Sequence, residues 1–409
     1  MALTRFSKID IVVSMSERVA EAAKASQNHP ATPSLERWGF EARSLPQTTS
    51  YPAQHHTMST TTVTLGDRTF EIDEAKAQEA YAAKKVINGR DTMFFNILPL
   101  KYQWAYELYK EMKNNHWEPE DVALRADADL WDALPEEAQQ VLQMLMGYQA
   151  SSGEITGAEE IYAIRDIVTA PELKLVFGRY VHEQNTQQDV LVHIFSSLGL
   201  NPSQCTQGFA EVAAKLSAFT AEHLVELDRH LDMTDLANKR AFAKNTFFFS
   251  QCMEGLQLYS LYAQLIGLGH RGLLTGVSEI FTKLLRDAGF RCELFRKLFI
   301  ELCQENPDIR DAAFDAELEA LMQSAVAVEQ EFIANALPEL EQSGYTAESL
   351  TTYIDHVAAK RLASCGLGPE PAGSSLPQLD EVFFPSEVHA MHASATTSSS
   401  ISDFDDDDL

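Results

Sequence analysis

A run of long helical segments between about residues 98 and 365 constrains the fold more than any other feature. At the start of this run, Leu100, Trp104 and Leu108 recur at a spacing of four, which places them on one face of a helix. Segments with alternating β-branched residues, the mark of strands, are nearly absent. The chain is therefore predicted to be all-α, a bundle of long helices.

Helix boundaries can be predicted at several points of this run. Pro171 and Gly199 stand at the start and near the end of one segment, where helices favour proline and glycine respectively. The dipeptide Asn306-Pro307 predicts the end of another long helix, because a residue before proline avoids helical geometry. The strongly apolar segment 239–272 is expected to be helical and buried on several sides.

Composition excludes some classes of function. The 409 residues carry a formal net charge of −28, which argues against nucleic acid or an anionic membrane surface as a partner. No apolar run is long enough to span a bilayer, and the N-terminus lacks the pattern of a signal peptide. The five cysteines are scattered and form no CxxC pair, which is typical of reduced thiols. We therefore predict a cytoplasmic protein with no membrane or nucleic-acid partner.

Composition also predicts three regions. Residues 1–75 are expected to be a disordered or weakly ordered N-terminal extension, and the first 57 of them could equally be absent from a protein that starts at Met58. Residues 76–368 are expected to form the helical domain. Residues 369–409 are rich in proline, then in serine and threonine, and finally acidic, which predicts a flexible tail.

Several segments carry a resemblance to a known family. In chain order they are LPLKYQWAYELY (98–109), NNHWEPEDV (114–122), VTAPELK (168–174), CMEGLQLYS (252–260), LLTG (273–276), LLRD (284–287) and YIDHVAAKRLASCGLGP (353–369). Together they resemble the small, radical-generating subunit of class I ribonucleotide reductase. The resemblance implies a ferritin-like bundle that usually forms a homodimer. It also implies a di-metal site in which two helices each supply a carboxylate and two others each supply Glu-x-x-His.

The chain departs from the family at most of these ligand positions. The glutamate of the third helix is retained as Glu254. The five other ligand-equivalent positions are Gly153, Gln184, Gln187, Ala288 and Arg291. Neutral amides are poor substitutes for carboxylates around divalent cations, and an arginine places a fixed positive charge where a metal would lie. No cofactor is therefore expected, and di-iron or manganese only if the chain is an active enzyme.

A lone buried carboxylate is costly, so Glu254 needs a partner. Arg291 is the obvious one, and we predict a Glu254–Arg291 ion pair joined by the amides of Gln184 and Gln187 in place of the metal cluster. A one-residue slip in register could hide ligands, since Glu154, His182 and Glu183 adjoin the expected positions. Because one residue turns a helical side chain by about 100°, solvated or inter-helix polar groups are the simpler interpretation.

The radical machinery implied by the family is also incomplete. Trp117 and Asp287 match positions of the family's transfer path, although Trp117 also suits a simple core position. Leu191 stands where many members carry the radical tyrosine, and no tyrosine follows Tyr353. In the acidic tail, Phe404 and Leu409 have the layout of a short peptide that docks on the large subunit.

These observations predict a ribonucleotide reductase small-subunit-like protein that serves deoxyribonucleotide synthesis as a non-catalytic structural or regulatory partner. Its expected partners are the large subunit and a second small subunit, in a homodimer or in a heterodimer with a competent copy. Two alternatives stay open. One is an active ribonucleoside-diphosphate reductase small subunit that uses an unconventional radical, and the other is a helical interaction protein that kept only the scaffold.

Overall fold

A computed structural model describes residues 61–65, 68–72, 74–90, 97–134, 136–155, 158–225, 227, 230–335, 337, 343–373 and 376–384. The chain divides into two units, Met1–Thr60 and Thr61–Leu409, and the first lies outside the described residues. The second contains all the elements discussed below. Among the described helices, none combines the length and apolar character needed to cross a bilayer.

The elements before the mid-point of the chain are β1 (Thr61–Leu65), β2 (Arg68–Ile72), α2 (Glu74–Ala83), α3 (Gln103–Asn114), the short η1 (Pro119–Asp121), α4 (Arg125–Trp131), α5 (Glu136–Ile155), α6 (Ala158–Ile167), α7 (Pro171–Leu198) and α8 (Pro202–His223). The later elements are α9 (Leu236–Phe247), a π-helical turn η2 (Phe248–Met253), α10 (Glu254–Leu256), α11 (Tyr259–His270), α12 (Thr275–Glu305), α13 (Ala312–Asn335), α14 (Ala347–Ser364) and α15 (Pro377–Phe383).

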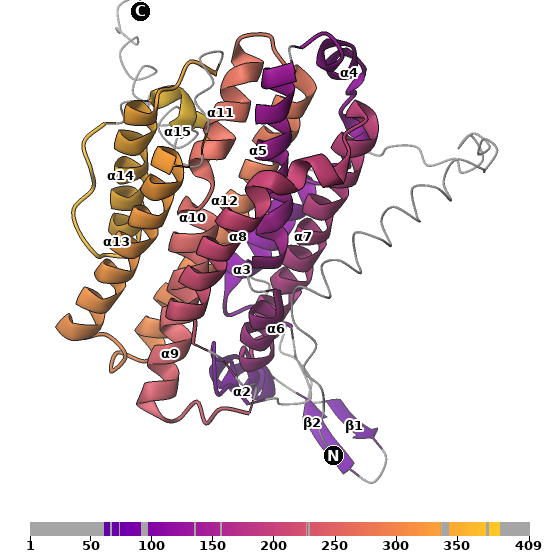
Figure 1. The fold of residues 1–409 in the computed structure, drawn as a ribbon. Helices are drawn as coiled ribbons and strands as arrows, with labels where there is room; N and C mark the ends of the chain where they lie inside the picture. Colours follow the sequence, from indigo (N-terminus) through magenta and orange to yellow (C-terminus); the bar gives the residue numbers. More distant parts are fainter. Residues whose placement is uncertain are drawn as a thin grey trace, which may run out of the picture. The chain divides into compact units, whose positions relative to one another are not determined.

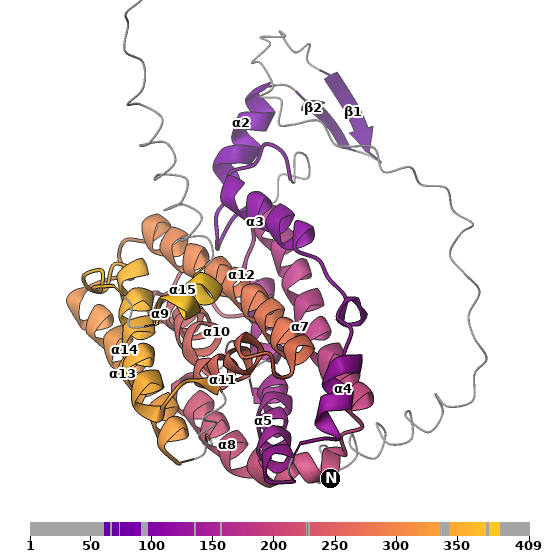
Figure 2. The same cartoon turned by 90° about the horizontal axis from the view of Figure 1, so that it is seen from above.

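The long helices pack side by side and bury one continuous core (Figure 1). Neighbouring pairs are α5 with α8, α3 with α7, α11 with α12 and α13 with α14, and α12 also contacts α9. Viewed from above, α12 lies between the first and last parts of the bundle (Figure 2). Aromatic side chains such as Phe177, Phe249 and Phe295 are fully buried here and meet edge-on or tilted. The predicted all-α, ferritin-like bundle is confirmed.

Several predicted boundaries are confirmed. Helix α7 begins at Pro171 and ends at Leu198, and its C-cap Gly199 has a φ of 65°, the left-handed value that closes a helix C-terminus. Helix α12 ends at Glu305, directly before Asn306. The stretch that follows Pro135 forms two helices, α5 and α6.

The strands β1 and β2 form an antiparallel hairpin in which Val63 pairs with Phe70. This hairpin lies within residues 1–75, which the sequence analysis assigned to a disordered or weakly ordered extension. The signal was present in the sequence, since two short segments rich in Thr, Val, Ile and Phe flank the turn-forming pair Gly66-Asp67. Residues 1–60 of that predicted extension, and 385–409 of the predicted tail, lie outside the described residues.

The apolar segment 239–272 is not one continuous helix. After α9 it passes through the π-helical turn η2 and the short α10, and it then breaks at Leu258, which has a φ of 63°. The buried carboxylate of Glu329 on α13 accepts hydrogen bonds from the backbone N–H groups of Leu258 and Ser260 at 2.9 and 3.1 Å. Glu329 therefore satisfies backbone donors that the break leaves unpaired.

Candidate functional site

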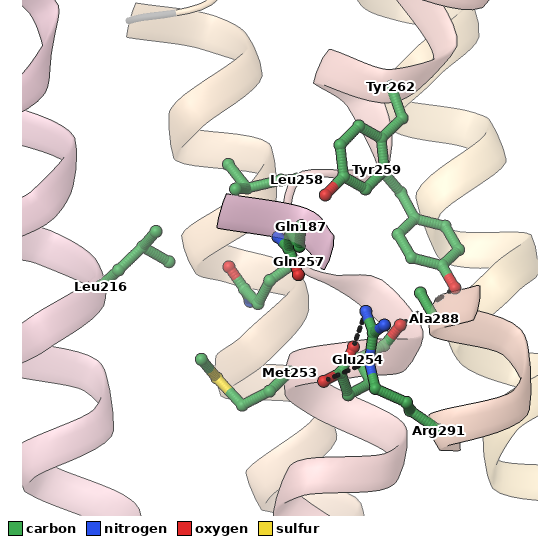
Figure 3. Close-up of a pocket in the computed structure, with 10 residues that line it drawn as sticks. All are labelled: Gln187, Leu216, Met253, Glu254, Gln257, Leu258, Tyr259, Tyr262, Ala288 and Arg291. Atoms are coloured by element: carbon green, nitrogen blue, oxygen red, sulfur yellow. Dashed lines mark hydrogen bonds and ion pairs between the residues drawn. The ribbon is translucent and has the colours of Figure 1, made fainter. Parts of the chain in front are cut away.

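The ligand-equivalent positions come from four helical segments of the bundle. Gln187 on α7, Glu254 on α10, and Ala288 and Arg291 on α12 line one small cavity of about 40 Å³ (Figure 3). The other lining residues are Leu216, Met253, Gln257, Leu258, Tyr259 and Tyr262. Gly153 falls in α5, in a stretch whose side chains lie outside the described part of the chain. The structure thus brings most of the predicted positions together.

The centre of the site is an ion pair between Glu254 and Arg291. Arg291 Nε donates to Glu254 Oε1 and Arg291 Nη2 donates to Glu254 Oε2, each at 3.0 Å (Figure 3). The two side chains are 10% and 4% exposed. This two-pronged geometry matches the planar guanidinium to the planar carboxylate and is the strong form of such a pair. The predicted ion pair is confirmed.

The predicted role of the two glutamines needs correction. Gln184 reaches the ion pair only through Tyr180, because Gln184 Nε2 donates to Tyr180 Oη at 3.0 Å and Tyr180 Oη donates to Glu254 Oε1 at 2.9 Å. Gln187 lines the cavity, but no hydrogen bond among the described residues joins it to Glu254 or Arg291. Tyr180 was not among the predicted site residues, although its position four residues before Gln184 places both on one face of α7.

A second cationic side chain braces the backbone that carries Glu254. Arg361 on α14 donates from Nε to the carbonyl of Gly255 at 3.1 Å and from Nη2 to Tyr259 Oη at 3.0 Å. Tyr259 Oη in turn donates to the carbonyl of Glu254 at 3.1 Å. Tyr259 is a buried core residue, and through this hydrogen bond it also helps to hold the broken segment. Arg361 was not singled out by sequence, because its partners, the carbonyl of Gly255 and the hydroxyl of Tyr259, lie far away in the chain.

Burial and charge set the protonation of the site. Burial by itself opposes the charge on Arg291, but the adjacent Glu254 carboxylate outweighs it and raises the pKa of the guanidinium. Burial, followed by the charge of Glu254, raises the pKa of Tyr180 well above its usual value. These shifts favour Tyr180 as a neutral donor and Arg291 as a cation at neutral pH.

Trp117 and Asp287 form a second polar cluster next to the first. Trp117 Nε1 donates to Asp287 Oδ2 at 3.0 Å, and Asn115 Nδ2 donates to Asp287 Oδ1 at 2.8 Å. Arg286 extends this cluster to the surface by donating to Asn115 Oδ1 at 3.1 Å. Asp287 is buried, and burial raises its pKa. Trp117 is thus both a core residue and a hydrogen-bond donor to a buried carboxylate.

The residues next to the ligand positions behave differently from one another. Glu183 is only 2% exposed and pairs with Arg179 on its own helix, at 3.2 Å from Oε1 to Nε, so it is neither solvated nor inter-helical as expected. Burial, and then the charge of Asp287, raises the pKa of Glu183 to about 8. His182 is exposed as expected and lies against His116, with ring centroids 5.4 Å apart. The side chain of Glu154 lies outside the described residues.

The remaining predicted positions lie elsewhere. Leu191 is half-buried on α7, four residues beyond Gln187. Phe404 and Leu409 lie outside the described residues.

Together the bundle and the cavity at its centre define the class of this protein, a ferritin-like carboxylate bundle whose central positions hold an ion pair. The profile of the family "Ribonucleotide reductase, small chain" matches residues 94–370. The chain belongs to that family, and it is a small-subunit-like protein of ribonucleotide reductase.

Individual relatives agree with this assignment. The chain is 26% identical over 305 residues to the ribonucleoside-diphosphate reductase subunit beta of Chlamydia pneumoniae, covering 73% of this chain and 88% of the relative. Two solved structures share the fold. The ribonucleotide reductase R2 subunit from Clostridium botulinum has a TM-score of 0.61 at 21% identity, over 73% of this chain and 94% of that one. The ribonucleotide reductase Rnr4 homodimer from Saccharomyces cerevisiae has a TM-score of 0.60 at 20% identity, over 78% of this chain and 96% of that one.

Proposed function

We propose that this chain serves deoxyribonucleotide synthesis as a non-catalytic partner subunit that assembles no di-metal cofactor. The observation that carries the proposal is the two-pronged ion pair of Glu254 with Arg291 at the centre of the ligand-equivalent positions. Both oxygens of the one retained carboxylate are engaged by a guanidinium that cannot lose its proton. The carboxylate is therefore already neutralised by a side chain of the protein itself.

The donor set supports the same proposal. Two divalent cations need anionic oxygens and imidazoles, whereas the described positions around Glu254 offer two neutral amides, a methyl group and a cation. Among the described residues, no group of three or more His, Cys, Asp or Glu side chains is placed to hold a metal ion. The residues present do not fit the family's metal centre.

As a partner subunit, the chain would act through its surfaces. Its proposed partners are the large subunit, through the tail positions Phe404 and Leu409, and a second small subunit in a homodimer or a heterodimer. The family relation supports the first partner, and one structural relative is itself described as a homodimer. A pseudoenzyme of this kind would stabilise or regulate an active copy without making a radical.

Elemental analysis tests the proposal directly. The full chain is incubated with ferrous or manganous ions and oxygen, desalted, and analysed for metal content and by electron paramagnetic resonance, beside a competent small subunit treated in the same way. We expect near-zero metal and no radical signal from this chain. About two metal ions per chain would overturn the proposal.

A second candidate function is favoured by the cluster around Asp287. The hydrogen bond between Trp117 and Asp287 joins two residues that match positions of the family's transfer path. The chain could then be an active reductase subunit with an unconventional radical. A radical signal from metal-free protein, together with reductase activity in the presence of a large subunit, would favour this candidate. Loss of both in a Trp117→Phe variant would tie the activity to the retained path.

A further inference from the structure

A basic groove lies between α12, α14 and α15. The face of α12 that lines this groove is not the face that carries Arg291. It encloses about 1010 Å³ and contains five cationic side chains against three acidic ones, a net formal charge of +2. The cations are Arg286, Arg296, Lys297, Lys360 and Arg361, and the acids are Glu111, Glu293 and Glu381. A positive groove is unusual for a chain whose net charge is −28.

The arrangement of charges within the basic groove leaves positive charge in excess. Glu293 is shared by two cations, since it lies 2.6 Å from Arg296 Nε and 3.4 Å from Lys297 Nζ. Arg286, at one end, is exposed and makes its hydrogen bond to the neutral side chain of Asn115. At ordinary ionic strength a charged ligand responds mainly to groups within about 10 Å, so the local charge of the groove outweighs the distant acidic surface.

The described chain ends at the wall of this groove. The ring of Phe384 lies under two of the groove's cations, 3.9 Å from Lys360 Nζ and 4.6 Å from Arg361 Cζ. Helix α15, which ends one residue earlier, packs on α12 (Figure 2). Phe384, the last described residue, therefore lies at the wall of the basic groove.

The chemistry of residues 385–409 complements the basic groove. They contain six acidic residues and no lysine or arginine, and five of the acids lie in Asp403–Asp408 around Phe404. The groove offers apolar wall residues for an aromatic or aliphatic side chain, among them Leu108, Phe290 and Val382. The 18 residues between Phe384 and Asp403 can span roughly 60 Å, which is ample to return to the groove.

We propose that the acidic segment 402–409 binds in the basic groove of its own molecule, with its aspartates on the groove's cations and its apolar side chains on the groove's apolar wall. A consequence, which rests on the proposed function, is that the same segment cannot dock on a large subunit at the same time. Intramolecular docking would then lower the affinity of this chain for the large subunit until a competing surface displaces the segment.

Peptide binding tests the proposal without any large subunit or metal, so its failure would leave the proposed function standing. A fluorescent peptide with the sequence of residues 401–409 is titrated into the full chain and into a variant that ends at Ser400. We expect the peptide to bind the shortened variant and to bind the full chain at least about tenfold more weakly, because the attached segment competes at a high effective concentration. Binding should weaken with added salt.

Two charge reversals in the shortened variant locate the site. Lys297→Glu and Arg286→Glu should each weaken peptide binding about tenfold. Lys215→Glu, which reverses a surface charge on α8 that pairs with Glu331 outside the groove, should leave it unchanged. A peptide in which Phe404 and Leu409 are replaced by alanine should bind more weakly than the natural one if the apolar wall contributes.

Three results would overturn the proposal. The peptide could fail to bind the shortened variant, or it could bind that variant and the full chain equally well. In the third, carbodiimide cross-links between Asp405–Asp408 and Lys297 or Lys360 would form in an equimolar, exchanged mixture of isotopically light and heavy chains, and about half of the linked pairs would join a light to a heavy copy. That pattern would assign the groove to the segment of a second copy.

Discussion

Two buried polar clusters on α12 have opposite relations to the family pattern. The outer cluster keeps the family's residues, with Trp117 donating to Asp287 at 3.0 Å. The inner cluster, one helical turn further along α12, contains positions that we predict to depart from the family's ligand set, and it holds Glu254 against Arg291. The comparison shows that a buried carboxylate can be kept within the bundle when a cation of the protein itself neutralises it.

The inner cluster should respond most strongly to mutation. Arg291→Met leaves the Glu254 carboxylate buried without a cation, and we expect the free energy of unfolding to fall by about 3–5 kcal/mol. Urea denaturation followed by circular dichroism measures the change. Arg286→Met, on the same helix but exposed, is the matched control and should cost less than about 1 kcal/mol. The double variant Glu254→Gln/Arg291→Met should recover most of the loss. A single-variant loss below about 1 kcal/mol would mean that the pair is not essential.

Glu183 lies between the two clusters and should make stability depend on pH. In the unfolded chain the Glu183 carboxyl loses its proton near pH 4.5, whereas in the folded chain it does so only near pH 8. The folded state binds more protons between these values, so the free energy of unfolding should fall as pH rises from 4.5 to 8 and level off above 8. The expected slope is at most about 1.4 kcal/mol per pH unit.

The variant Glu183→Gln should lack this part of the pH dependence, because an amide does not titrate. Glu279→Gln, an exposed glutamate on α12, serves as the control and should keep it. Thermal unfolding at pH 5, 6, 7 and 8 makes the comparison. Parallel pH profiles for Glu183→Gln and the natural chain would show that Glu183 is ionised in the folded state.

The outer cluster should show a smaller effect. Trp117→Phe removes the indole donor to Asp287, while Asn115 still donates to that carboxylate. We expect the free energy of unfolding to fall by about 1–2 kcal/mol more in Trp117→Phe than in Trp131→Phe. Trp131 is similarly buried, but its indole donates to no carboxylate among the described residues. Equal losses in the two variants would indicate that the hydrogen bond to Asp287 adds nothing to stability.

The smallest effect is expected at the edge of the inner cluster. Tyr180→Phe removes one hydrogen bond to Glu254 but leaves both hydrogen bonds from Arg291. We therefore expect the free energy of unfolding to fall by about 1 kcal/mol. Tyr109→Phe, whose hydroxyl has no hydrogen bond among the described residues, should be nearly neutral. A cost at Tyr180 as large as that of Arg291→Met would mean that the tyrosine, and not the arginine, is the main partner of Glu254.

Much of the architecture was predictable from local sequence. The spacing of apolar residues, together with Pro171, Gly199 and Asn306-Pro307, predicted long helices and several of their ends, because these signals act within one or two helical turns. The family resemblance placed Glu254 and Arg291 at one site, and opposite charge in a buried place predicted their pairing. The hairpin of β1 and β2 was also predictable, from two short β-prone segments around Gly66-Asp67, but was not recognised.

The tertiary structure alone decided how the site is supported. The break at Leu258 depends on Glu329, and the bracing of Gly255 depends on Arg361, residues about 70 and 106 positions away in the chain. Periodicity likewise tells which face of α7 Glu183 occupies but not how deeply that face is buried. The physical reason is that helix propensity and capping act over short distances in sequence, whereas burial and the partners of a buried charge are set by whichever distant segments the fold packs against it.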